Sequence, residues 1–289
     1  MTTYRGRGIF YGAAAGVALS LGGLLVRLMS GETSGWQMLS WRSLAFAALM
    51  FTIAGFRAGS LRQAFANITG AGWLGAGIAL SIGLGQIAYL MGLVHTSVAN
   101  VTFLLGSAPI LAAFAAWLLL GERLSARGII ALFAAMSGIA VMFSGGISGG
   151  HLLGIGYAVC ALLAYVSMVL MFRKVGPIDT FAASGFGGLL AAGISIWMTG
   201  GDLAIAPADA MLSVVSGLFQ VGAGFTFITL AARYIKAAEV TLLVLLETIL
   251  GPFLVWFFLA ETPGPATLTG GTIVIVSVAA FAILTRETD

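Results

Sequence analysis

The chain has 289 residues, of which 60% are hydrophobic and only 8% are charged. Soluble domains carry roughly 25% charged residues, so this composition excludes an ordinary soluble protein and predicts an all-α integral membrane protein. The net charge is +3, but the basic residues are scattered among short loops and form no patch for nucleic acid. One cysteine and two histidines exclude an internal disulfide and a Cys/His metal cluster, and we expect no cofactor.

Apolar runs of about 20 residues, the length that crosses a bilayer as a helix, recur ten times along the chain. The first run follows Arg5 and Arg7 and is too long for a secretory signal, so we interpret it as an uncleaved span. The connections between runs are short and leave no room for a soluble domain. In chain order the predicted spans are 9–28, 35–55, 71–93, 98–120, 126–144, 152–172, 179–198, 209–231, 238–260 and 266–284.

The basic residues predict how these spans are oriented. Cytoplasmic loops of membrane proteins carry an excess of Lys and Arg. If the N-terminus is cytoplasmic, eleven of the 13 basic residues fall on the cytoplasmic side, and only Arg27 and Arg42 fall on the outer side. We therefore expect both termini to be cytoplasmic.

The sequence repeats itself. The segment Ser81 to Glu122 aligns without gaps with Gln220 to Glu261, 139 positions later, and an offset of 146 aligns Arg27 with Arg173. Each repeat contains five spans, an odd number, so the second copy must enter the membrane from the opposite side. We therefore predict ten transmembrane helices arranged as two inverted five-helix repeats. The two predicted domains are residues 1–147 and 148–289.

Glu247 is the sharpest candidate for a functional residue. It lies in the middle of an apolar run, where a carboxyl costs about 2.5 to 3.5 kcal/mol on insertion scales. In a desolvated cavity such a carboxyl could take up a proton or bind a substrate amine near neutral pH. The alternative is a protonated Glu that only hydrogen-bonds a neighbouring helix. Its repeat partner is Ala108, so packing symmetry alone does not require a carboxyl at this position.

Prolines in two spans mark candidate hinges or kinks, because proline removes a helical hydrogen bond. They are Pro109, and Pro252 with its neighbour Gly251; a static kink filled by packing is the alternative. Further side chains within the spans are candidates for substrate binding, although intramembrane polar groups often only hold helices together. Together with Glu247, the predicted binding residues are Ser20, Gln86, Tyr89, Asn100, Phe103, Ser107, Tyr165, Gln220 and Thr248.

Structural roles are expected for three other charged residues. Arg42 lies about six residues into its span, and its side chain is expected to snorkel to the outer interface. Anchoring or a salt bridge at the outer mouth is favoured there over substrate binding. Glu122 and Glu261 occupy equivalent positions of the two repeats at the ends of spans, where we expect a structural role in the turn.

The chain resembles the drug/metabolite transporter superfamily, and specifically its EamA-type repeats. The resemblance is carried by WRSLAFAAL from Trp41, APILAAFAAWLLLGERLSARG from Ala108 and LLETILGPFLVWFFLAE from Leu245, and it extends over essentially the whole chain. One departure is that the proline of the family's ninth span is Thr248 here, with Pro252 four residues later.

This resemblance implies a single-chain carrier in the bacterial cytoplasmic (inner) membrane that exports small organic metabolites by alternating access. It also implies a central cavity lined chiefly by spans 1, 3, 4, 6, 8 and 9. Amino acids or their derivatives are the first choice of substrate.

Two other classes of function compete with an exporter. One is a facilitative channel or a uniporter for other small metabolites, because inverted repeats occur in some channels too. The other is a membrane-embedded enzyme, but all four aspartates lie in loops or at span ends, so no aspartyl dyad forms at the membrane centre, and we expect no enzymatic activity.

The expected partners are an amino acid-like substrate and the lipid bilayer, without nucleic acid; the oligomeric state is left open, and a monomer is compatible with the sequence.

Overall fold

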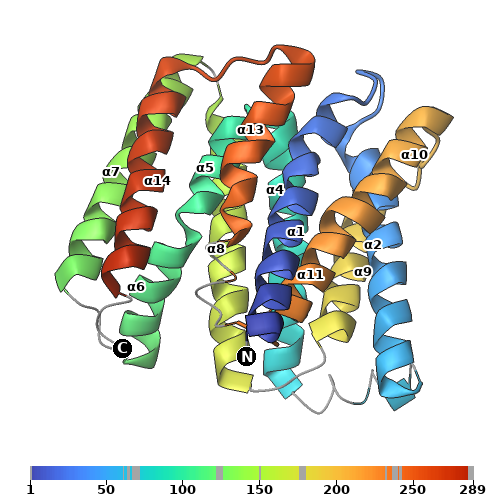
Figure 1. Ribbon diagram of the computed structural model, residues 1–289. Helices are drawn as coiled ribbons and strands as arrows, with labels where there is room; N and C mark the ends of the chain where they lie inside the picture. The colour runs from blue at the N-terminus through green and yellow to red at the C-terminus, as the bar shows by residue number, and fades with distance from the viewer. Residues whose placement is uncertain are drawn as a thin grey trace.

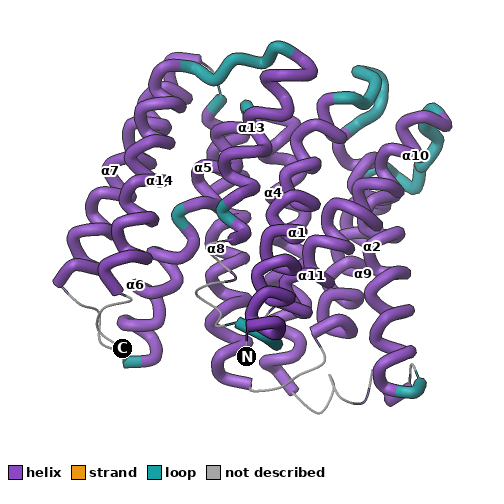
Figure 2. Tube along the Cα trace, in the orientation of Figure 1, coloured by secondary structure: helices purple, strands orange, loops and turns teal. Residues whose placement is uncertain are grey.

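A computed structural model describes residues 2–60, 62–63, 66, 72–121, 126–149, 151–175, 180–231, 233–235, 240 and 243–285. Regular structure within these ranges is helical (Figure 2). With the labels of Figure 1, the helices in chain order are α1 (Thr2–Arg27), α2 (Gly35–Ala58), α4 (Gly72–His95), α5 (Val98–Gly106), α6 (Ala108–Leu120), α7 (Ala126–Gly149), α8 (Leu152–Val175), α9 (Thr180–Met198), α10 (Pro207–Val215), the π-helix η1 (Ser216–Gly222), α11 (Ala223–Ala231), α13 (Leu246–Leu259) and α14 (Pro265–Thr285).

Six helical segments of the described chain are long and apolar enough to cross a membrane, and counting the bent pair α5 and α6 as one span makes seven. Three shorter apolar stretches coincide with the other predicted spans. They are Ile129–Met142 in α7, Leu246–Leu259 in α13 and Pro265–Ser277 in α14. The prediction of an all-helical membrane protein is therefore confirmed, whereas the number of ten spans stays a prediction.

The helices run side by side as one bundle (Figure 1). Helix α4 packs against α8 and α9, α2 packs against α9, and α7 packs against α14. Helix α1 contacts both α11 and α13, which come from the other half of the chain. The beginning of α1 and the end of α14 lie at the same end of the bundle (Figure 1).

Three predicted spans are not continuous α-helices. The span 98–120 breaks at Ser107, where α5 and α6 meet with a bend of 40°. The span 209–231 contains the π-helix η1 between α10 and α11. In the span 238–260, α13 begins only after Leu245 and then runs through Pro252 without a break.

The breaks at Ser107 and Leu245 lie close together in space. A Cβ atom added to Gly106, at the end of α5, would lie 3.0 Å from Cγ2 of Thr248 in the first turn of α13. Small residues allow such close approach between helices in a membrane. In the alignment of the repeats, Ser107 corresponds to Leu246, so the two breaks occur at nearly equivalent positions.

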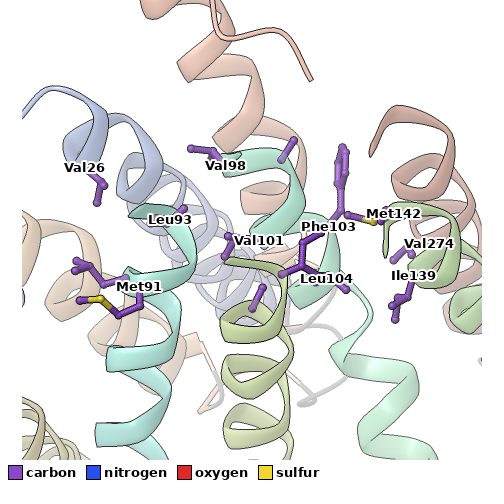
Figure 3. Close-up of a cluster of buried hydrophobic side chains, with 14 of the residues drawn as sticks. Val26, Met91, Leu93, Val98, Val101, Phe103, Leu104, Ile139, Met142 and Val274 are labelled. Carbon is purple, nitrogen blue, oxygen red and sulfur yellow. The ribbon is translucent and has the colours of Figure 1, made fainter. Parts of the chain in front are cut away.

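The main hydrophobic cluster lies around α5, between α4 on one side and α7 with α14 on the other. Figure 3 shows Phe103 of α5 in this cluster, on the side of Met142 and Val274. The ring of Phe103 is also in direct contact with Gly271 of α14, because a Cβ atom at that glycine would overlap the ring.

Candidate functional site

Polar side chains from four helices meet in the interior of the bundle. We define the central polar cluster as Arg42 of α2, Tyr89 of α4, Ser216 and Gln220 of η1, and Glu247 of α13. Arg42 is hydrogen-bonded to Ser216 and Gln220 and contacts the ring of Tyr89. Tyr89 in turn is hydrogen-bonded to Glu247.

Arg42 is the most buried charged side chain of this cluster. Only 2% of its surface is exposed, so the expectation that it snorkels to the interface is wrong. Its Nε donates to Oγ of Ser216 and its Nη2 to Oε1 of Gln220, both at 3.2 Å. The guanidinium carbon lies 5.6 Å from the centroid of the Tyr89 ring, within the range of a cation–π contact. These partners keep the side chain inside the bundle.

The π-helix η1 places the two acceptors of Arg42. Its Gly217 packs directly on α2, because a Cβ atom there would lie 2.3 Å from the backbone oxygen of Arg42. The hydroxyl of Ser216 donates to Oε1 of Gln220 at 3.1 Å, and Nε2 of Gln220 donates to the carbonyl of Leu19 in α1 at 3.4 Å. These bonds orient Oε1 of Gln220 toward the guanidinium. Single π-turns occur frequently at functional sites.

Glu247 lies in the first turn of α13, directly after the break at Leu245. The backbone N–H groups at a helix start are unpaired within the helix, and the dipole favours a carboxylate there. Tyr89 donates its hydroxyl hydrogen to Oε1 of Glu247 at 3.2 Å. A Cβ atom on Gly22 of α1 would lie 2.5 Å from this hydroxyl and 2.9 Å from Nε2 of Gln220. A glycine at position 22 therefore lets both side chains pass close to α1.

Several polar atoms near the central polar cluster have no hydrogen-bond partner among the described residues. They are Nη1 of Arg42, Oγ of Ser43 and both side-chain amide atoms of Gln86, and all three residues are buried. Gln86 precedes Tyr89 by one helical turn on α4, so the two share a face. Arg42 and Glu247 both belong to the described part of the chain and form no ion pair with each other there. They are nevertheless close enough for their charges to interact.

Two further predicted residues lie next to this cluster. Tyr165 of α8 interacts electrostatically with Glu247. Thr248 is buried and packs on Gly106 at the contact between the two helix breaks. Of the predicted binding residues, Tyr89, Gln220 and Glu247 thus form the cluster itself, and these two lie around the carboxyl.

Four other predicted binding residues have local or structural partners. The amide nitrogen of Asn100 donates to Oγ1 of Thr96 at 2.8 Å, and its oxygen accepts from Oγ1 of Thr267 at 2.7 Å. The second of these bonds links α5 to α14. Phe103 belongs to the hydrophobic cluster of Figure 3. The hydroxyls of Ser20 and Ser107 are used locally, because they donate to the carbonyls three residues before them, at 2.6 Å in each case.

The predicted hinge residues differ in their position relative to the helix breaks. Pro109 occupies the first turn of α6, immediately after the break at Ser107. Gly251 and Pro252 lie inside α13, whose break comes earlier in the chain. Gly251 faces α5, since a Cβ atom there would lie 3.3 Å from Cγ2 of Thr102.

A second charged contact closes one end of the bundle. Nε of Arg27, at the end of α1, lies 2.6 Å from Oε2 of Glu261, just after α13. Arg27 also donates to the carbonyls of Leu93 at 2.8 Å and Thr96 at 2.7 Å, while Oε1 of Glu261 accepts from the N–H of Val98 at 3.3 Å. This contact therefore joins α1, the α4–α5 turn and the end of α13.

The repeat counterparts of that contact are not described. Glu122 lies outside the described residues, and the side chain of Arg173 is also outside the described part of the chain. Among the described residues, no group of three or more His, Cys, Asp or Glu side chains could hold a metal ion.

Arg42 and Ser216 are the functional candidates that sequence reasoning missed. The available signal was an arginine inside an apolar span, because an intramembrane ionisable residue marks a functional site by default. A position six residues from the span end was compatible with snorkelling, and nothing in the sequence located the acceptors on η1.

Comparisons with known proteins agree with this architecture. The model of the EamA-like transporter family matches residues 6–144 and again residues 148–283. No curated protein matches the sequence. One protein crystal structure aligns over 98% of this chain and 98% of its own, with a TM-score of 0.63 and 17% identity, and thus shares the fold.

Proposed function

Because this chain belongs to the EamA-like transporter family, we propose that it exports amino acids or their derivatives from the bacterial cytoplasm by alternating access. Family membership itself implies secondary transport of small molecules by a multi-pass membrane protein, and not an enzymatic activity. The substrate class, the export direction and the inner-membrane location belong to the proposal.

The observation that carries this proposal is the position of Glu247. Its carboxyl is held by Tyr89 in the bundle interior, at the start of a helix that begins within a predicted span. Discontinuous helices form the substrate and ion sites of many secondary transporters. A carboxyl at this place is suited to bind the amino group of a substrate.

The packing of the helices supports the inverted repeats that alternating access uses. In the predicted repeat, α1 corresponds to α8, α4 to α11, and the pair α5 and α6 to α13. Helix α1 packs against α11 and α13, and α8 packs against α4 and against α5 with α6, so each contact has its counterpart. The ten spans and the domains 1–147 and 148–289 are part of this proposal. A shared end of the bundle for the beginning of α1 and the end of α14 is consistent with two cytoplasmic termini (Figure 1).

Counterflow in proteoliposomes tests the proposed function. Vesicles with purified protein are loaded with one unlabelled amino acid at a time, and uptake of the labelled compound is followed. A carrier accumulates label transiently and saturably, whereas a channel, the alternative function, gives flux without exchange. If no amino acid or derivative in a broad panel exchanges, the proposed substrate class is wrong.

Glu247→Gln tests the role of the carboxyl within the same assay. Gln has a similar size and can still hydrogen-bond Tyr89, so we expect normal folding and a strongly reduced flux. The matched control is Glu32→Gln, because Glu32 is exposed in the turn between α1 and α2. If Glu247→Gln instead transports as fast as the parent but melts at a lower temperature, the carboxyl only holds helices together.

A further inference from the structure

Arg42 has donors that the folded protein leaves unused. A guanidinium carries five N–H groups, and in Arg42 the Nε and Nη2 edges are bound by Ser216 and Gln220. Nη1 has no partner among the described residues although the side chain is only 2% exposed. Buried polar groups in folded proteins are almost always paired, so an unpaired arginine nitrogen calls for a partner, which is either ordered water or a ligand.

The partners of Arg42 hold its position without neutralising its charge. Ser216 offers a hydroxyl oxygen and Gln220 an amide oxygen, and both are uncharged. A buried cation without a contacting anion is costly unless another group compensates for it. The fork of a guanidinium matches a carboxylate in geometry, and such pairs form the stronger, charge-assisted hydrogen bonds.

The second ionisable group of the cluster is the carboxyl of Glu247, which has the opposite charge to Arg42 when it is ionised. Tyr89 lies between them, with its ring 5.6 Å from the guanidinium carbon and its hydroxyl 3.2 Å from Oε1 of Glu247. A ligand with one negative and one positive group would complement both charges and leave the buried cluster neutral. A simple anion or a simple amine would complement only one of them.

We propose that Arg42 binds the carboxylate of the substrate through Nη1 while Glu247 binds its ammonium group, so that the site selects zwitterions with both groups free. This inference rests on the proposed function and adds the requirement for a free carboxylate. Ser43 and Gln86 add polar atoms without partners among the described residues, and the amide of Gln86 can both donate and accept.

The test compares one amino acid with two blocked derivatives. Counterflow is measured for the free amino acid, for its amide, which lacks the carboxylate, and for its N-acetyl form, which lacks the ammonium. The variants are Arg42→Gln, Arg42→Lys and Glu247→Gln. The control is Ser40→Ala, since Ser40 is buried on the same helix but hydrogen-bonds Ser195 of α9 instead of the central polar cluster.

The parent protein should prefer the free amino acid over both derivatives by at least about tenfold, the effect of losing a charge-assisted hydrogen bond. In Arg42→Gln the preference over the amide should fall to within about twofold, whereas the preference over the N-acetyl form persists. Glu247→Gln should give the opposite pattern, and Ser40→Ala should keep both preferences. Arg42→Lys retains the charge without the fork and should retain a reduced preference over the amide.

The assignment of Arg42 is overturned if Arg42→Gln lowers the flux of the free amino acid and of its amide by the same factor, because Arg42 then only positions its neighbours. If Arg42→Gln does not fold, Arg42→Lys serves as the test variant. The assignment is then overturned if Arg42→Lys prefers the free amino acid over its amide as strongly as the parent protein does. A failure of the proposed function is separate and visible earlier, since the parent protein would then exchange no amino acid at all.

Discussion

Gly22→Ala should reduce transport strongly while it leaves the protein folded, because this glycine lies against the side chains of the central polar cluster. The new Cβ atom would lie 2.5 Å from Oη of Tyr89 and 2.9 Å from Nε2 of Gln220. An ordinary contact begins near 3.4 Å, so the Tyr89 hydroxyl must move by about 0.9 Å. Its hydrogen bond to Glu247, already 3.2 Å long, would then be stretched or broken.

Two effects on folding oppose each other in this variant. Replacing Gly by Ala inside a helix stabilises it by about 1 kcal/mol. Overpacking a buried contact costs about 1 to 3 kcal/mol. The cost should lie toward the lower end of this range here, because the atoms that must move are the terminal atoms of side chains. We therefore expect a net destabilisation of about 0 to 2 kcal/mol. Loss of the bond to the carboxyl should cost transport about 1.5 to 3 kcal/mol, a reduction of roughly 10- to 100-fold.

The matched control for this experiment is Gly193→Ala. Gly193 lies on α9, and a Cβ atom there would meet nothing within 4 Å. This substitution adds the same methyl group to a helix without touching the central polar cluster, so melting temperature and flux should stay at or above those of the parent. Both variants would be purified, melted and assayed for counterflow side by side. Parent-like flux in folded Gly22→Ala would refute the importance of the contact between Tyr89 and Glu247.

Other contacts give predictions of different kinds. Arg27→Gln and Glu261→Gln should each destabilise the protein by about 1 to 3 kcal/mol, because each weakens a partly exposed ion pair together with charge-assisted hydrogen bonds to the backbone. The double variant should lose less stability than the sum of the two single variants in a double-mutant cycle followed by thermal melting. Asn100→Ala should lower the melting temperature by removing two buried hydrogen bonds, including that to Thr267, but should leave the substrate preference unchanged. An altered preference would show that Asn100 does contact the substrate. A fluorescent protein fused after Asp289 should be active and alkaline phosphatase inactive, and the reverse would contradict a cytoplasmic C-terminus.

The sequence was informative where a residue type conflicts with its surroundings. Glu247 stands out as a carboxyl inside an apolar run, and the structure places it in a buried polar cluster with Tyr89 and Gln220. Arg42 conflicts with its surroundings just as strongly. It was misinterpreted because a long side chain near a span end can reach water, and only the packing of η1 on α2 shows that it turns inward.

The helix breaks were harder to predict than the helices. Proline is the main breaking signal in a sequence, and Pro109 does follow the break at Ser107. The other break precedes Pro252 by seven residues, at Leu245, while α13 continues through the proline. The first turn of α13 packs against the end of α5 at Gly106, and such a tertiary contact leaves no local signature in the sequence.

Direct contact between the two broken spans bears on leakage of protons and ions through the membrane. Gly106 and Thr248 touch where α5 ends and α13 begins, so neither span can bend at its break without pressing on the other. Because close-packed atoms transmit displacement instead of absorbing it, a movement that loosens one side of this crossing tightens the other. A continuous water column past the crossing would require both breaks to separate at once. Close packing between the two halves of the chain is what a carrier needs at such a crossing if the cell is to keep its ion gradients while solutes cross.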